Sequence, residues 1–107
     1  MTNIIVTTGN EIPGKKIIGI IGVVRGSTVR ARNIGRDIGA GFKNLVGGEI
    51  KTYTDMANNS RDEAYNRMVN QAIEMGANAI IGFRFATSMI MQGASEMLAY
   101  GTAVQVK

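Results

Sequence analysis

Residues 60–85 read SRDEAYNRMVNQAIEMGANAIIGFRF, and the periodicity of the apolar residues changes within this stretch. Ser60, with Glu63 three residues later, forms a capping box that is typical of a helix start. Apolar side chains then recur on one helical face, at Ala64, Met68, Ala72 and Met75. Gly76 suits the left-handed residue that ends a helix, and residues 78–90 have the composition of a strand. The stretch therefore predicts a helix that leads directly into a strand.

The rest of the chain predicts three more strands and a weaker helical region. Residues 3–8 and 16–30 are rich in Ile and Val and are separated by a turn, and residues 95–107 form a last strand. Residues 34–57 carry apolar side chains at helical spacing but contain several glycines. The order of strand, strand, helices, strand and strand predicts an α+β fold built on an antiparallel sheet, in a single domain over residues 1–107.

The predicted strands are apolar on both faces. In residues 17–24 and 79–86, neither of the two alternating sets of side chains is a polar set. An antiparallel sheet with one solvated face would alternate apolar with polar residues, so this sheet needs a cover on both sides. The helix that begins at Ser60 can cover one face. The other face requires the glycine-rich helical region or a neighbouring subunit, which favours a homo-oligomer.

The composition removes most of the residues that catalysis uses. The chain has 107 residues without cysteine or histidine, which excludes disulfides, thiolate nucleophiles, imidazole bases and nearly all zinc sites. Carboxylates could still meet as an acid–base pair, although their spacing forces no two together; the candidates are Asp37, Glu49, Asp55, Asp62 and Glu63. We therefore expect a protein that is not an enzyme, with an unrecognised carboxylate-based enzyme as an alternative.

Two further features allow alternative interpretations. Seven methionines, including Met89, Met91 and Met97, could bind Cu(I) through soft thioethers, although methionine more often fills cores and interfaces. Five cations lie in residues 25–43 and could contact nucleic acid phosphates. No recognition module accompanies these cations, so a solvated face or intersubunit ion pairs are the simpler interpretation. A nucleic-acid-binding ring stays an alternative.

Hydropathy favours a protein of the cytoplasm. No signal peptide precedes the first strand. The longest apolar run, residues 17–24, is about eight residues, whereas a span of the bilayer takes about 20. We therefore expect no membrane partner.

The stretch VGGEIKTY at residues 46–53 interrupts the helical region. Gly47 and Gly48 each lower helix stability by about 1 kcal/mol relative to alanine, so the helix is predicted to break here. Glu49 would then lie at the start of the next helical turn, where the helix dipole favours a carboxylate.

Cations on apolar strands suggest a role for this break. Arg84 and Arg25 would need anions if they are buried, and we predict Glu49 of the same or the next subunit as their partner. A ligand site would lie at the break between the glycines and Glu49, together with Tyr53 and Arg61. Free backbone amides and a charge would converge there at a subunit boundary.

Four segments carry a resemblance to a known family. They are GIIGVVRG at residues 19–26, RNIGRDIGAGFKNLVGGEIKTYTDM at 32–56, RDEAYNRMVNQAIEMGANAIIGFRF at 61–85 and AYGTAV at 99–104. Together they resemble the YbjQ-like family, small bacterial and archaeal proteins of unknown function that are described as heavy-metal-binding. The resemblance implies a compact antiparallel sheet with packed helices, similar to the dodecin subunit fold, assembled as a homopentameric ring.

The resemblance also implies heavy-metal binding, with the cofactor unknown. Without cysteine or histidine, any metal site must use carboxylates, carbonyls and thioethers. These donors favour hard cations or Cu(I) over zinc, cadmium or mercury. We therefore expect a homo-oligomer, by resemblance a pentamer, that binds a metal ion or a small ligand.

Overall fold

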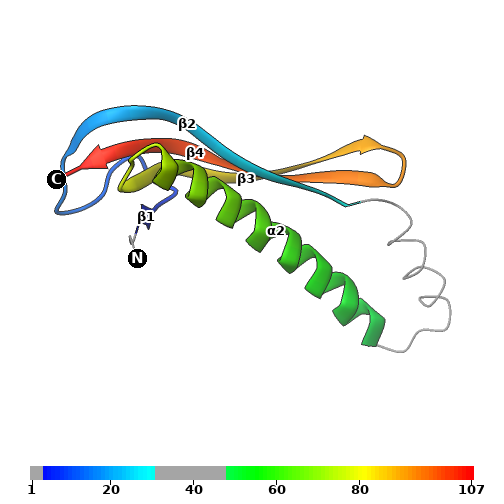
Figure 1. The fold of residues 1–107 in the computed structure, drawn as a ribbon. Coiled ribbons are helices and arrows are strands. Elements are labelled where there is room, and N and C mark those ends of the chain that lie inside the picture. The colour runs from blue at the N-terminus through cyan, green and yellow to red at the C-terminus, as the bar shows by residue number, and fades with distance from the viewer. Residues whose placement is uncertain (1–3, 31–47) are drawn as a thin grey trace.

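The computed structural model describes residues 4–30 and 48–107, and for residues 48–56 it describes the backbone alone. Its elements are β1 (Ile5–Val6), β2 (Ile17–Arg30), α2 (Gly48–Glu74), β3 (Ala79–Met91) and β4 (Ala94–Val106). Figure 1 shows a long sheet with α2 running across one face, so the predicted α+β class is confirmed. The glycine-rich helical residues 34–45, and Gly47, lie outside the described residues.

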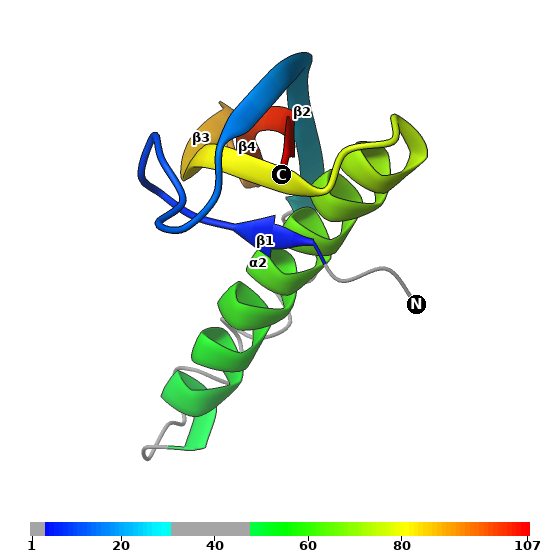
Figure 2. The ribbon, with the colours of Figure 1, turned by 90° about the vertical axis from the view of Figure 1, so that its left-hand side faces the viewer.

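The four strands form one sheet in the order β1-β3-β4-β2. β4 pairs antiparallel with both β2 and β3, as predicted, whereas β1 pairs parallel with β3. The sheet is therefore mixed, and the prediction of a purely antiparallel sheet is wrong for β1. The connection gives the reason: after β1 the chain crosses to the opposite edge of the sheet before β2 begins, so β1 and β2 cannot form a hairpin (Figure 2).

The helix α2 is continuous over 27 residues, so the predicted new start at Ser60 is wrong. Ser60 lies inside the helix and is 5% exposed. Its carbonyl accepts a hydrogen bond of 3.2 Å from the hydroxyl of Thr28 on β2. Packing against the sheet therefore outweighs the local capping preference, which is a weak signal by itself. The described part of α2 extends from Gly48 and has Glu49 in its first turn, whereas the predicted break after Val46 falls at residues that include Gly47, outside the described part of the chain.

The end of α2 follows the prediction. Gly76 has a φ of 86° and therefore adopts the left-handed conformation. Its N–H donates to the Ile73 carbonyl, and the Ala77 N–H donates to the Ala72 carbonyl, each at 3.0 Å. These two bonds form the Schellman motif that satisfies the last carbonyls of a helix. Directly afterwards, the Asn78 side-chain amide bonds to both the N–H and the carbonyl of Val106, which aligns β3 with β4.

The face of the sheet toward α2 holds the main core. Its buried residues are mostly small; they are Val24, Ala64, Met68, Ala72, Ala77, Ile80, Ala99 and Ala103. Gly26 marks the closest approach, because a Cβ atom there would overlap the backbone of Ala64 and Met68. The small side chains therefore let α2 lie almost on the backbone of β2. Toward Gly48, α2 diverges from the sheet (Figure 1).

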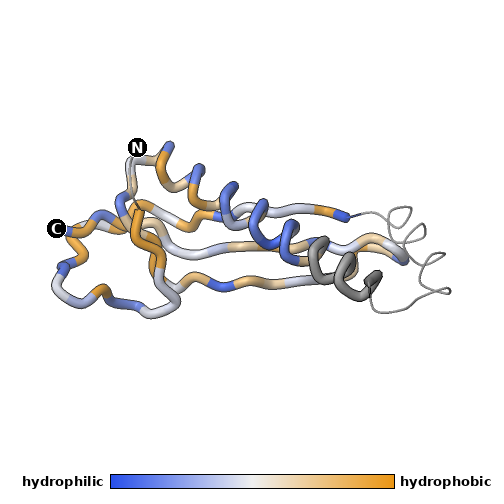
Figure 3. The backbone as a smooth tube through the Cα atoms, turned by 90° about the horizontal axis from the view of Figure 1, so that it is seen from below, coloured by the Kyte–Doolittle hydropathy of each residue, from blue (hydrophilic) through white to orange (hydrophobic). Residues whose placement is uncertain are grey.

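The face of the sheet away from α2, which we call the open face, is covered at one end. There Ala79, Val104 and Val106 pack with side chains that include Ile12, from the segment between β1 and β2. Apolar segments gather at this end, where the C-terminus lies (Figure 3). Farther along, apolar side chains stand exposed in the described part of the chain. The segment between β1 and β2 therefore covers one end of the open face, and among the described residues no segment covers the middle of that face. Cover by the glycine-rich helical region or by a neighbouring subunit stays a prediction.

Candidate functional site

The two strand arginines singled out from the sequence share one row of the open face. Arg25 on β2 and Arg84 on β3 both pair with Tyr100 on β4, one from each side. Arg25 alternates with Val24 and Gly26, which face α2, so its side chain lies on the opposite side of the sheet. Paired residues share a face, and the three residues therefore form one row, which we call the arginine row.

Backbone carbonyls fix the guanidinium of Arg84. Its Nη1 donates to the carbonyl of Thr8 at 2.9 Å and to the carbonyl of Phe83 at 2.8 Å. Phe83 is itself held by edge-to-face contacts with Tyr65 and Phe85. A guanidinium carries five N–H donors, so three of them remain beyond these two bonds. The guanidinium of Arg84 is therefore held in place before an anion binds, and it can donate further hydrogen bonds to that anion.

Side chains of α2 protect the outer edge of β2 at the arginine row. The Arg25 backbone N–H donates to Gln71 Oε1 at 2.8 Å, and the Ser27 carbonyl accepts a hydrogen bond from Arg67. An exposed strand edge can pair with another chain unless such groups satisfy it. A partner at this level of β2 would therefore contact the open face rather than extend the sheet.

Glu63 links α2 to the end of β2. It forms ion pairs with Arg30 at 3.0 Å and with Arg67 one helical turn later. The hydrogen bond from Arg30 lowers the pKa of the Glu63 carboxyl, and the positive charge of Arg67 lowers it further. Arg30 belongs to the basic stretch 25–43, most of which lies outside the described residues. For Arg30, the intramolecular ion pair is the arrangement observed.

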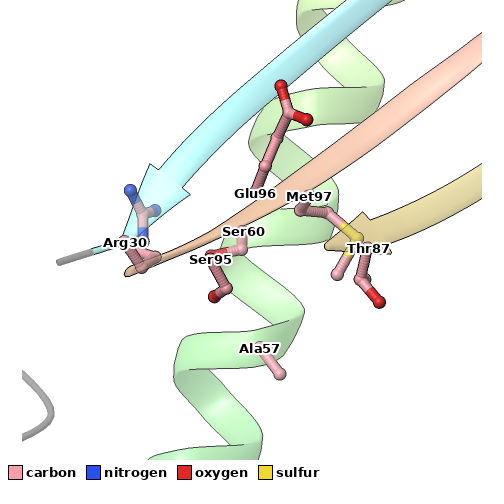
Figure 4. A pocket seen from close by; sticks show the side chains of 7 residues that line it. All are labelled: Arg30, Ala57, Ser60, Thr87, Ser95, Glu96 and Met97. Atoms are coloured by element: carbon pink, nitrogen blue, oxygen red, sulfur yellow. The ribbon is translucent and has the colours of Figure 1, made fainter. Parts of the chain in front are cut away.

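A pocket of about 220 Å³ lies where α2 diverges from the sheet, and we call it the wedge pocket (Figure 4). Its lining combines hydroxyls, a thioether and charged groups; the residues are Arg30, Ala57, Ser60, Thr87, Ser95, Glu96 and Met97. Across the described residues, no three His, Cys, Asp or Glu side chains lie close enough to hold a metal ion. The described residues therefore form no cluster of the side chains that hold zinc, and no cluster of three carboxylates.

The structure separates the predicted site residues into two groups. Gly48, Glu49 and Tyr53 lie in the first turns of α2, and Arg61 is exposed on the same helix. Gly47 lies outside the described residues. Arg25 and Arg84 lie on the open face, whereas α2 packs on the opposite face. A contact between either arginine and Glu49 of the same chain would have to cross the sheet. Glu49 of the next subunit therefore stays the predicted partner of the two arginines.

Sequence reasoning missed Tyr100 and the hydroxyl residues of the wedge pocket. Tyr100 was visible as part of AYGTAV, and strand alternation assigns it a face. Its position between the two arginines depends on the register of β4 with both neighbours, which no single strand encodes. The wedge pocket depends on the continuous path of α2 through Ser60, where the sequence predicted a helix start instead.

No helix among residues 4–30 and 48–107 is long and apolar enough to cross a membrane.

Comparisons with known proteins place these features in a family. The YbjQ family model, whose description reads "Putative heavy-metal-binding", matches residues 4–107. The chain is 56% identical to a UPF0145 protein of Methanoculleus marisnigri over 95% of both chains. It is 52% identical to a UPF0145 protein of Archaeoglobus fulgidus over 97% of this chain and 96% of that relative.

A solved structure shows a similar fold. It is the crystal structure of a protein of unknown function of the DUF74 family from Pediococcus pentosaceus, with a TM-score of 0.64. The match covers 97% of this chain and 98% of that chain at 19% sequence identity. The likeness therefore extends over the whole fold, and it concerns the fold alone.

Proposed function

Because this chain belongs to the YbjQ family, whose description names heavy-metal binding, we propose that it is a non-enzymatic homo-oligomer that binds a metal ion or a small ligand. Relatives that match nearly the full chain carry the name UPF0145 protein, which states no reaction. The lack of cysteine and histidine favours binding over catalysis. We expect the protein in the cytoplasm.

The observation that carries this proposal is an uncovered apolar stripe on the open face. It runs along β2 through Ile20, Val23 and Val29, with Arg25 between the two valines, and Ile20 is 75% and Val23 is 72% exposed. Covering apolar surface contributes about 25 cal/mol for each Å² removed from water. A second copy of the chain that covers the stripe would therefore stabilise both subunits.

A ring of five subunits is the assembly that we propose. The number five and the likeness to the dodecin subunit fold come from the sequence resemblance. Closed rotational symmetry gives every subunit the same neighbour, so each stripe would be covered once and none would stay exposed at an end. The protected edge of β2 at Arg25 and Ser27 favours contact through the open face.

The arginine row would then lie close to a subunit boundary. Arg25 and Arg84 flank Tyr100 on the open face, and a neighbour that covers this face would remove water from them. A desolvated cation is costly unless an anion accompanies it. We therefore propose that a carboxylate of the next subunit, with Glu49 as the candidate, or the acidic group of a small ligand pairs with the row.

The metal part of the proposal is limited by the donors that the described residues supply. Their acidic side chains form no group of three that could hold an ion. Thioethers and hydroxyls are the donors near the wedge pocket, through Met97, Thr87, Ser95 and Ser60. Thioethers select soft ions such as Cu(I). A soft monovalent ion is therefore the metal that these residues fit.

A charge placed in the stripe tests the assembly. We expect Val23→Lys to separate the subunits, because each interface would then contain an unpaired buried ammonium group. The fold of the chain itself should change in stability by less than about 0.5 kcal/mol, because Val23 is a surface residue within one subunit. Light scattering coupled to size exclusion gives the mass, and far-ultraviolet circular dichroism gives the fold.

Asn66→Lys is the matched control. Asn66 is exposed on α2, so the same charge is added away from the stripe. The control should keep the mass of the parent protein. If Val23→Lys also keeps that mass, the open face does not form the interface, and the proposal fails.

A further inference from the structure

The hairpin of β3 and β4 extends beyond the cover of α2, and it carries exposed methionines. Met89 on β3 is 76% exposed, whereas Met68 in the core is 0% exposed. Methionine commonly fills irregular space in a core, and this explains Met68. Packing among the described residues does not explain Met89. The exposed position of Met89 therefore requires a reason other than core packing.

The strand register brings Met89 next to Met97. Thr87 pairs with Met97, and Met89 pairs with Ser95, so the two methionines are diagonal neighbours on adjacent strands. Diagonal neighbours on one face lie about 7–8 Å apart between backbones, within reach of long side chains. Methionine is unbranched and has three rotatable bonds, which lets two thioethers on neighbouring strands approach each other.

Both methionines lie on the side of the sheet toward the wedge pocket. Met97 on β4 pairs with Thr28 on β2. The hydroxyl of Thr28 donates a hydrogen bond to Ser60 on α2, so Met97 also faces the helix. Met97 and Thr87 both line the wedge pocket (Figure 4). Met89 follows Thr87 by two residues on the same strand and therefore shares its face. A register shift between Met89 and Met91 takes Met91 out of this alternation.

The charges around the pair are compatible with a monovalent cation. Arg30 also lines the wedge pocket, but its guanidinium is paired with Glu63 at 3.0 Å. Glu96 also lines the wedge pocket, but it alternates with Met97 on β4, so its side chain lies on the opposite face of the sheet. The lining of the wedge pocket therefore holds one arginine, which is paired with Glu63, and the thioether of Met97, and Met89 lies two residues beyond Thr87 on the same face.

We propose that Met89 and Met97 form a two-thioether site for a soft monovalent cation, Cu(I) or its analogue Ag(I). The proposal rests on the metal-binding part of the proposed function and names the ion class and the residues. Thioethers bind soft ions, whereas zinc prefers thiolate and imidazole and hard cations prefer oxygen. The site therefore discriminates Ag(I) and Cu(I) from Zn²⁺, Mg²⁺ and Ca²⁺.

A titration of the full chain with Ag(I) tests this site. The methionine methyl groups are labelled with ¹³C, and their signals are followed by NMR. We expect the signals of Met89 and Met97 to shift together and to saturate at one ion for each chain. The signals of Met68 in the core and of Met75 at the end of α2 should not shift. An equal addition of Zn²⁺ should shift none of the four signals.

Substitution by leucine supplies the matched variants, because leucine keeps a similar volume without sulfur. We expect Met89→Leu and Met97→Leu each to weaken Ag(I) binding at least tenfold in calorimetry. Met75→Leu, also an exposed methionine, should bind as the parent does. Met89 is exposed, so its replacement should leave the fold intact.

Three results would overturn the site: unchanged affinity in both hairpin variants, equal shifts of all exposed methionines, or no shift at all. The mass of the same sample distinguishes a failure of the thioether site from a failure of the proposed oligomer. An oligomer that binds metal with its methionine signals unmoved would keep the proposed function and reject the thioether pair. A monomer in which Met89 and Met97 shift with Ag(I) would reject the oligomer and keep the pair.

Discussion

The two faces of the sheet are made by the same three long strands, but they differ in side-chain size and in cover. Toward α2 the strands present Gly26, Ala99 and Ala103, and the helix lies close enough to exclude water. On the open face they present Val23 and the arginine row, which stay exposed beyond the end covered by the segment between β1 and β2. Small residues thus mark the face that α2 covers, and larger ones mark the face that stays exposed among the described residues.

The largest expected effect is on the covered face. Gly26→Ala would push a Cβ atom into the backbone of Ala64 and Met68, which cannot move as a flexible side chain would. We expect a loss of about 3 kcal/mol in the free energy of unfolding, at the upper part of the range for overpacked cores. Urea unfolding followed by circular dichroism measures this loss.

Gly19→Ala is the control for that experiment. Gly19 is also a glycine of β2, but an added Cβ would lie 4.0 Å from the Cβ of Gln105, an ordinary contact. Gly19→Ala should lower the free energy of unfolding far less than Gly26→Ala does. Equal losses in both variants would mean that general strand preference, rather than the approach of α2, determines the glycine at position 26.

A smaller effect is expected where α2 is joined to the end of β2. Glu63→Gln removes the ion pairs with Arg30 and Arg67, and we expect a lower urea midpoint at neutral pH. The hydrogen bond from Arg30 lowers the pKa of Glu63 in the folded chain below its ordinary value of 4.5. The stability from this group is therefore complete above pH 4.5 and is lost as the pH falls through the lowered pKa.

The pH profile provides the check. Between neutral pH and about pH 3, the parent should lose more stability than Glu63→Gln, because the variant has no carboxylate to protonate there. Asp62→Asn, at the exposed neighbouring acid, should follow the parent profile. Parallel profiles for the parent and Glu63→Gln would show that the ion pairs contribute nothing to folding.

Much of the fold could be predicted from the sequence, because its signals are local. Periodicity and composition identified β2, β3 and β4, and a single glycine identified the end of α2 at Gly76. The start of α2 was missed because the capping pattern at Ser60 competes with a tertiary contact to Thr28. The direction of β1 was missed because two residues carry no orientation signal.

The candidate site was predictable only in part. Arg25 and Arg84 stood out as cations on apolar strands, and the structure brings them to either side of Tyr100. Their proposed partner Glu49 belongs to a helix on the other face, so its role depends on a neighbouring subunit. Register and assembly are relations between distant segments or chains, and a single-strand pattern does not contain them.

In the assembly that we propose, a second copy of the chain covers the open face. Light scattering on the purified full chain at micromolar concentration measures the mass without any substitution. We expect a mass of about five times the 11.4 kDa of one chain. A mass of 11.4 kDa, with the fold intact, would contradict the account, because the stripe and the arginine row would then face water in the working protein.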